Sequence, residues 1–177
     1  MTPTETPAAT DVVTPTASPT ARLVYRRATA FGPAENVQPP KKPELAVQNS
    51  KDGLEAFTRY WFALLNHGYE TGDHSLWLQS TFASCQYCAN IRSSIDEVFR
   101  DGGWQAGGTV DLKITKPTLR PSEPQQQVLV DVRQEATAYF KADGSQAGTS
   151  DPADSTEVVI LANFKDGWTV EDMHPVR

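Results

Sequence analysis

The sequence has few of the residues on which many catalytic, metal-binding and nucleic-acid-binding sites depend. Its 177 residues include two cysteines and three histidines, and 22 acidic residues outnumber 16 basic ones. Binding to nucleic acid requires a clustered surplus of Lys and Arg that neutralises phosphate charge. We therefore predict no nucleic-acid partner. Because no apolar run approaches the roughly 20 residues that cross a bilayer, we also expect a chain without a spanning segment of its own.

The first 43 residues differ in composition from the remainder. Residues 1–20 contain seven Thr, four Pro and three Ala but almost nothing large and apolar, so little burial offsets the entropy of ordering them. We predict that residues 1–43 form a disordered Thr/Pro/Ala-rich stalk and an extended arm, and that residues 44–177 form a single domain. The scattered apolar residues of the segment 23–37 favour an arm that packs on the domain surface.

A stalk of this composition is typical of exported proteins, where it separates a domain from an anchor. We therefore expect that Met1 is a fragment end or a misassigned start, and that a signal segment lies upstream. The predicted location is extracytoplasmic, in the cell envelope or secreted. A cytoplasmic protein with a flexible tail remains the alternative.

Two segments carry apolar residues at helical spacing. The first follows Asn49 and Ser50, which are suited to cap a helix, and ends near Gly68 and Gly72. Its apolar stripe consists of Leu54, Phe57, Trp61, Leu64 and Leu65. The second segment follows Ser84 as a cap and ends at Gly102 and Gly103, with the stripe Cys88, Ile91, Ile95, Val98 and Phe99. A short helix that starts at Asp73 is predicted between them.

The second half of the chain changes to an alternating pattern that is typical of half-buried strands. This pattern runs through residues 110–114, 128–133, 158–163 and 168–170. Asp166 and Gly167 separate the last two runs and predict a tight hairpin in which both turn residues have positive φ. Between Tyr139 and Thr156 the pattern predicts a polar loop. Helices followed by antiparallel strands make an α+β fold, with about three helices packed on a curved four-stranded sheet.

This order of elements resembles the cone of the nuclear transport factor two and ketosteroid isomerase superfamily, which is also described as cystatin-like. Several short motifs resemble an uncharacterised family of actinobacterial lipoproteins, the domain-of-unknown-function family six-three-one-eight. They are GPAENV at 32–37, PELA at 43–46, GLEAF at 53–57, YW at 60–61, LN at 65–66, TGD at 71–73 and CQYC at 85–88. The resemblance implies secretion and a lipid anchor upstream of the stalk, with no assigned activity. Membrane contact is then expected only through an anchor that this chain lacks.

Cys85 and Cys88 are the only cysteines, and helical spacing places them within reach of a disulfide. In an oxidising compartment they would form a small structural clip. Alternatively, the helix N-terminus would lower the pKa of one thiol and make the pair redox-active. Thioredoxin-like proteins, however, place such a pair after a strand. A zinc site would need two further ligands, and the histidines at 67, 74 and 174 are scattered. We predict no metal and no cofactor.

Five residues are candidates for a pocket or its rim. His67 and His174 lie near element ends where they could line the mouth of the cone, although a lone histidine there is more often an exposed or satisfied polar residue. Tyr60, Trp61 and Trp104 are aromatic candidates, for which core packing is the simpler interpretation. Because the acidic residues of the strands occupy the predicted solvent face, we assign no catalytic residue.

Three functional hypotheses follow. The first is a non-catalytic envelope domain that binds a protein partner or a small apolar ligand, through the cone pocket or the open sheet face. A homodimer through that face is one form of it. The second is an enzyme of hydrolase or isomerase type that uses pocket His and Tyr residues. The third is a stalk-mounted module of a larger cell-surface complex.

Overall fold

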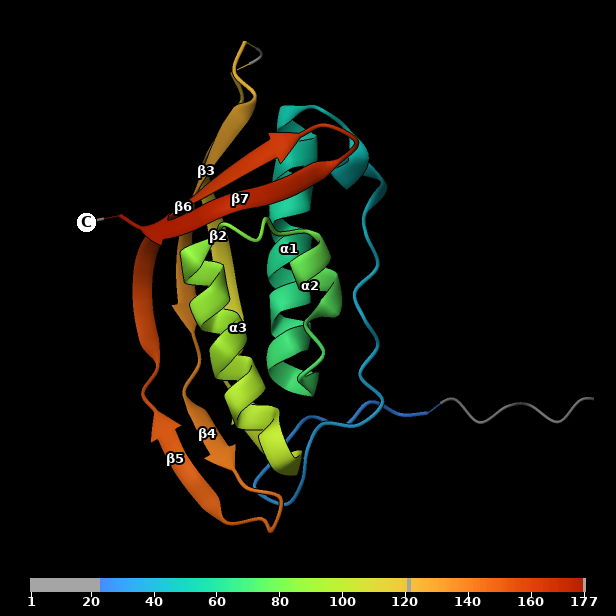
Figure 1. Ribbon diagram of the computed structural model, residues 1–177, viewed down its shortest axis with the longest axis vertical. Coiled ribbons are helices and arrows are strands. Elements are labelled where there is room, and N and C mark those ends of the chain that lie inside the picture. Colours follow the sequence, from blue (N-terminus) through green and yellow to red (C-terminus); the bar gives the residue numbers. More distant parts are fainter. Residues whose placement is uncertain (1–22, 121, 177) are drawn as a thin grey trace, which may run out of the picture.

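A computed structural model describes residues 23–120 and 122–176 (Figure 1). The predicted disorder of the leader therefore lies largely outside the described residues. The helical elements are η1 (Glu44–Val47), α1 (Lys51–Thr71), α2 (Ser75–Gln79), α3 (Gln86–Phe99) and η2 (Arg100–Gly102). The strands are β1 (Trp104–Gly107), β2 (Val110–Thr118), β3 (Gln125–Gln134), β4 (Thr137–Phe140), β5 (Gln146–Ser150), β6 (Ala153–Phe164) and β7 (Trp168–Pro175). Within the described residues, no helix is long and apolar enough to cross a membrane.

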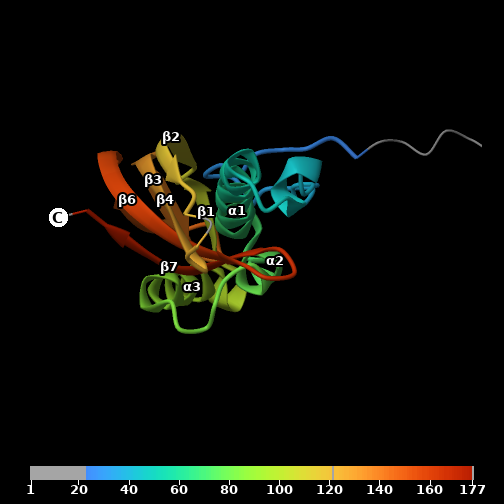
Figure 2. The same cartoon turned by 90° about the horizontal axis from the view of Figure 1, so that it is seen from above.

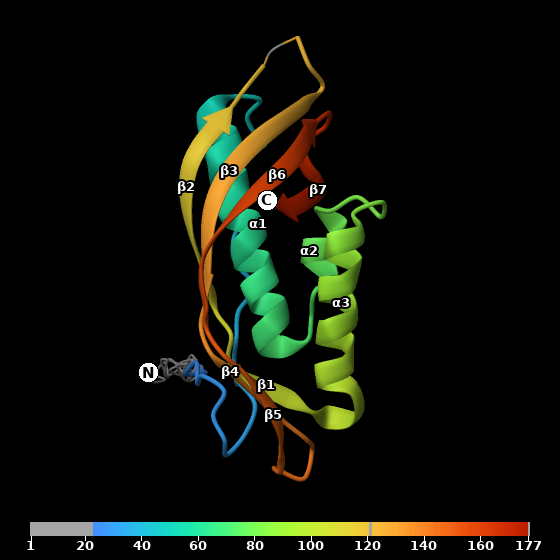
Figure 3. The same cartoon turned by 90° about the vertical axis from the view of Figure 1, so that its left-hand side faces the viewer.

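The strands form two antiparallel sheets. The larger sheet has the order β2-β3-β6-β7, with Val130 paired to Ile114 on one side and to Val158 on the other. The smaller sheet has the order β1-β4-β5. The chain runs almost directly from β3 into β4 and from β5 into β6, so the small sheet extends the large one downward in the same curved surface (Figures 1 and 3).

Helix α1 forms because the sequence supplies a cap, an apolar stripe and a stop. The Ser50 side chain accepts a hydrogen bond from the backbone N–H of Gly53 at 3.0 Å. All five residues of the predicted stripe are at most 2% exposed. The helix ends at Gly72, whose φ of 78° is accessible to glycine at little cost. These three local predictions are confirmed.

The helices cover one side of the curved sheet. Helix α1 lies on the concave face of the sheet, and α2 and α3 lie beside α1 (Figures 2 and 3). The main core joins the α1 stripe to inward-facing sheet residues, including Val128, Ile160 and Val170, which are all fully buried. The predicted α+β cone, with three helices packed on a curved four-stranded antiparallel sheet, is confirmed.

Four local predictions need correction. The stretch 139–156 is not a single loop, because it holds β5 and the ends of β4 and β6. Its Gly, Ser and Gln residues lack apolar alternation because β5 is an edge strand whose side chains are almost all exposed. The hairpin between β6 and β7 is confirmed, but Lys165 joins the turn and Gly167 alone of the Asp-Gly pair has positive φ. Helix α3 is capped by Cys85 rather than by Ser84. His74 rather than Asp73 occupies the N-cap position of α2, although the Asp73 carboxylate accepts a hydrogen bond from the backbone N–H of Ser75 at 3.0 Å.

The arm packs on the domain as predicted for residues 23–37. Arg26 and Glu35 form an isolated bridge, so the arm folds back on itself. Ala28 is 7% exposed and lies in a second small cluster with Trp104 and Phe140. Arg27 pairs with Glu135 and donates to the Thr109 hydroxyl at 3.1 Å. The predicted boundary at residue 44 stays a prediction.

Candidate functional site

A large cavity lies between α3 and the small sheet and has a volume of about 930 Å³. Its walls come from the end of α1, the second half of α3, the turn that leads into β1, and the strands β1, β3, β4 and β5. In Figure 3, the second half of α3 leads down toward the small sheet, and residues of both line the cavity. A volume of this size accommodates a small organic molecule.

Two glycines allow the elements near the cavity to approach each other closely. A Cβ at Gly103 would lie 2.3 Å from the carbonyl oxygen of Val98 and 2.9 Å from that of Phe140. The backbone can therefore turn from α3 into β1 against β4 only because this residue has no side chain. A Cβ at Gly72 would lie 2.7 Å from the Phe99 ring, so the end of α1 abuts the end of α3.

One wall of the cavity is apolar. Ile95 and Val98 of α3 contribute to it, together with Phe140 of β4 and the alanines at 142 and 147. Of the stripe predicted on α3, only Cys88 and Ile95 are fully buried, while Ile91, Val98 and Phe99 are half-buried. An apolar helix face that stays half-exposed over a cavity is a surface that a ligand can cover.

The back of the cavity is polar but uncharged. It is formed by Tyr69, Gln105 and Gln134. Burial raises the pKa of the Tyr69 phenol to about 12, the phenols of Tyr87 and Tyr139 add to the rise, and the Gln134 amide opposes it. Tyr69 therefore keeps its proton at any physiological pH and is available as a hydrogen-bond donor.

Gln105 is the most unusual of these residues. It is only 5% exposed, and its side-chain amide has no hydrogen-bond partner among the residues that the structure describes. The amide of Gln134, in contrast, donates to the carbonyl of Gly108 at 3.1 Å. The Gln105 amide is not among the fully buried polar atoms that lack a partner, so it remains accessible from the cavity and is free to bond to water or to a ligand.

The charged residues of the cavity all lie at its mouth. Three are acidic and two are basic, and all are exposed: Glu97, Arg100, Asp101, Lys141 and Asp143. The two signs nearly cancel. Ser145 donates from its backbone and its hydroxyl to Asp143, which lowers the pKa of that carboxyl below its usual value. The mouth therefore presents no strong field of one sign to an approaching ligand.

A second, smaller cavity of about 390 Å³ lies beneath the arm. Tyr25, Arg27 and Ala28 of the arm form part of its wall. Tyr69 and Gln105 line both cavities, so these two side chains separate one from the other. The Tyr25 hydroxyl donates to Glu70 of α1, and this contact raises the pKa of Tyr25.

The aromatic candidates from the sequence lie outside the large cavity. Trp61 is fully buried in the main core and donates its indole N–H to the Thr81 hydroxyl at 2.9 Å. Tyr60 is 9% exposed, and the Lys42 ammonium lies 5.6 Å from its ring centroid. Trp104 stacks on Phe140 with ring centroids 5.3 Å apart, in the cluster beside the arm.

The structure does not bring the two candidate histidines together. The His67 ring lies 3.1 Å from the carbonyl of Asp73, near the end of α1. His174 is exposed at the end of β7, 3.7 Å from the Asp172 carboxylate, and lines a third pocket with Tyr87. None of the three histidines of the chain lines the large cavity.

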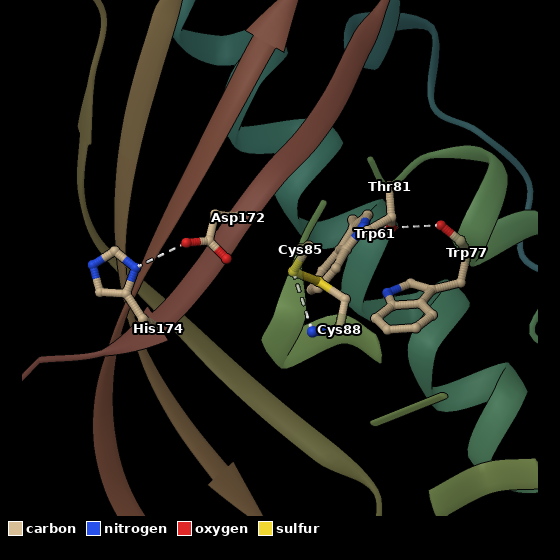
Figure 4. Close-up of a disulfide and its surroundings, with 7 residues drawn as sticks. All are labelled: Trp61, Trp77, Thr81, Cys85, Cys88, Asp172 and His174. Carbon is tan, nitrogen blue, oxygen red and sulfur yellow. Dashed lines mark hydrogen bonds and ion pairs between the residues drawn. A yellow bond between two sulfur atoms is a disulfide. The ribbon is translucent and has the colours of Figure 1, made fainter. Parts of the chain in front are cut away.

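Cys85 and Cys88 form the predicted disulfide at the start of α3 (Figure 4). Both residues are 2% exposed and belong to the main core. The backbone N–H of Cys88 donates to the sulfur of Cys85 at 3.2 Å, so the disulfide also caps the helix. Trp61 and Trp77 lie nearby in Figure 4. Among the described residues, no cluster of His, Cys, Asp or Glu is suited to hold a metal ion.

Sequence reasoning missed the residues of the large cavity. Tyr69 lies four residues after Leu65 on the same face of α1, so its inward orientation could be predicted from the spacing. A tyrosine so close to the end of the helix is, however, equally compatible with an exposed position. Gln105 lies in the four-residue strand β1, which is too short for alternation to reveal. No local signal distinguishes a buried glutamine from an exposed one.

Two solved structures are similar to this chain. The intermembrane space region of the chloroplast protein ARC6 matches with a TM-score of 0.53 and 12% identity, over 73% of this chain and 98% of that one. At this identity the likeness is one of fold. An NTF2-like protein from Anabaena variabilis matches with a TM-score of 0.37 and 11% identity, over 73% of this chain and 91% of that one.

The family follows from the sequence match. The model of a family of unknown function, DUF6318, matches residues 24–174, and the chain belongs to this family. The match includes the arm as well as the helices and both sheets. No match was found among the curated proteins.

Proposed function

We propose that this domain binds a small amphipathic molecule in the cavity between α3 and the small sheet. The observation that carries the proposal is the combination of a volume of about 930 Å³ with an apolar wall and an uncharged polar back. Small-molecule sites combine a largely apolar lining with a few hydrogen-bonding groups that fix orientation. The arrangement of Val98, Phe140 and Gln105 has this character.

The proposal includes an extracytoplasmic location. Its support is the Cys85–Cys88 disulfide, because disulfides persist mainly in oxidising compartments. Lipid anchoring through an upstream segment remains part of this proposal and rests on the sequence resemblance alone. The oxidation state of the two cysteines in protein taken directly from cells tests the location, since reduced thiols would contradict it.

Binding is favoured over catalysis because of where the titratable groups lie. Acid–base chemistry needs a group whose pKa lies near the working pH. Within the described residues, the pKa of Tyr69 is raised and that of Asp143 is lowered, both away from neutrality, and the histidines do not line the cavity. The ligand is therefore expected to leave the cavity unchanged.

Native mass spectrometry of gently purified protein tests the proposal. We expect wild-type protein to retain a small molecule, or to take one up from a lipid and metabolite extract. Ala147 is exposed on β5 and lines the cavity, so Ala147→Trp should obstruct the site and abolish retention. Ala153→Trp places the same side chain on an exposed position of β6 that does not line the cavity, and it should retain the molecule.

Two results would overturn the proposal. One is a ligand that remains bound in Ala147→Trp, because it would then occupy another site. The other is a stable dimer with no ligand uptake. That dimer would favour the outer sheet face, where Leu129 pairs with Val159 and both are half-buried.

A further inference from the structure

We propose that the ligand of this cavity is an uncharged molecule with a carbonyl group, and that Gln105 recognises this group with Tyr69. The inference rests on the proposed function and adds the chemical class of the ligand. It starts from the one polar side chain in the cavity wall that is both 95% buried and without a partner in the described part of the chain.

Gln105 borders both cavities. The residue lies in β1 and belongs to the polar back of the large cavity, which it shares with the smaller one. The side-chain nitrogen lies close to Gly108, where a Cβ would be 2.8 Å away. The amide makes no side-chain hydrogen bond within the described residues and is not fully buried, so a ligand group in the cavity is an available partner.

Tyr69 supplies the second donor. It lines the same two cavities as Gln105 and keeps its proton because its pKa is raised to about 12. A phenol O–H and an amide N–H are both donors, and a carbonyl oxygen has two lone pairs that accept from both. The pair therefore fits a ketone, an amide or an ester carbonyl.

The distribution of charged residues excludes an ionised head group at the back of the cavity. An ion at the back of the cavity would lose its hydration and would need a charged partner there. The back is formed by Tyr69, Gln105 and Gln134, and the charged residues remain exposed at the mouth. The apolar wall of Ile95, Val98 and Phe140 is available to the hydrocarbon part of the same molecule.

Fluorescence titration with three matched probes tests the inference. Prodan is a neutral naphthyl ketone, dimethylaminonaphthalene is its parent without the carbonyl, and ANS is an anionic naphthalene sulfonate. We expect wild-type protein to bind Prodan more tightly than ANS. Gln105→Leu keeps the approximate shape of the side chain and removes its amide, so it should weaken Prodan about fivefold and leave the parent unchanged.

Two further variants complete the test. Tyr69→Phe removes the other donor and should also weaken Prodan selectively, which keeps the inference testable if Gln105→Leu does not fold. Gln127→Leu makes the same chemical change at an exposed position of β3 outside the cavity, and it should bind all three probes as the wild type does.

The outcomes separate the inference from the function on which it rests. If both variants weaken Prodan and its parent equally, or if ANS binds more tightly than Prodan, the carbonyl inference is overturned while ligand binding stands. If no probe binds in a manner that Ala147→Trp abolishes, and no ligand is retained, both proposals fail. The inference is supported if Gln105→Leu and Tyr69→Phe both weaken the binding of Prodan and leave the binding of its parent unchanged.

Discussion

Trp104 donates its indole N–H to the carbonyl oxygen of Thr29, 2.9 Å away, and this bond joins the arm to the first strand of the small sheet. The same stretch of arm buries Ala28 against Trp104 and Phe140. The arm therefore covers apolar surface next to the large cavity, to which Phe140 also contributes.

Removal of the arm should destabilise the domain, whereas removal of the leader should not. We expect deletion of residues 1–37 to lower the free energy of unfolding by about 2 kcal/mol, because it exposes Trp104 and breaks the Thr29 hydrogen bond and the Arg27–Glu135 pair. Deletion of residues 1–22 is the control. Urea denaturation of both proteins measures the difference, and equal stabilities would contradict this role of the arm.

Gly103 should not tolerate any side chain. We expect Gly103→Ala to lower the free energy of unfolding by about 3 kcal/mol or more, because its Cβ would overlap two backbone carbonyl oxygens. Gly148→Ala is the matched control, since nothing lies within 4 Å of the corresponding Cβ. Its stability should change by less than about 0.5 kcal/mol. Thermal and urea denaturation measure both variants, and a wild-type-like Gly103→Ala would show that α3 and β4 can separate freely.

The disulfide should contribute modestly to stability. The closed loop is short, with a sequence separation of 3, so the loss of chain entropy that it imposes on the unfolded state corresponds to about 2 kcal/mol. Because the Cys85 sulfur also caps α3, the variant Cys85→Ser with Cys88→Ala removes the bond and retains a side-chain oxygen at the cap. The variant Cys85→Ala with Cys88→Ala removes both the disulfide and the cap. Its free energy of unfolding should be about 1 kcal/mol lower than that of the first double variant. Equal stability of the two double variants would refute the capping contribution.

Tyr69 should make the free energy of unfolding of the domain depend on pH above pH 10. Its pKa is 10.0 in a model phenol and about 12 in the folded protein, so above pH 10 the unfolded chain loses this proton while the folded chain keeps it. The stabilising contribution is complete below pH 10 and is lost as the pH rises to 12, with a total of about 3 kcal/mol. Stability measured across this window in the wild type and in Tyr69→Phe isolates the effect. A variant with the same slope as the wild type would show that the Tyr69 pKa is not raised.

Local patterns were enough to predict the main architecture. Leu54, Phe57 and Trp61 are buried because helical spacing places them on one face, and Val128 and Val130 are buried because alternation does the same in a strand. Ser50 caps its helix through its own side chain, which depends on neighbouring residues alone. The Cys85–Cys88 pairing is likewise local.

The large cavity could not be predicted because it depends on distant contacts. Tyr69, Gln105 and Phe140 come from three elements that are far apart in the sequence, and the shape of the cavity also depends on the close approach of α3 and β4 at Gly103. The small sheet was missed for a related reason. Strands β1, β4 and β5 have four, four and five residues, and β5 exposes most of its side chains, so no alternation marks it.

The most direct test of ligand binding in the cavity is amide chemical-shift mapping of the wild-type protein by NMR during titration with Prodan. The account predicts that the largest shifts occur at Val98, Gln105 and Phe140, which line the cavity. Shifts that are largest at Leu129, Val159 and Leu161, on the outer face of the large sheet, would contradict it.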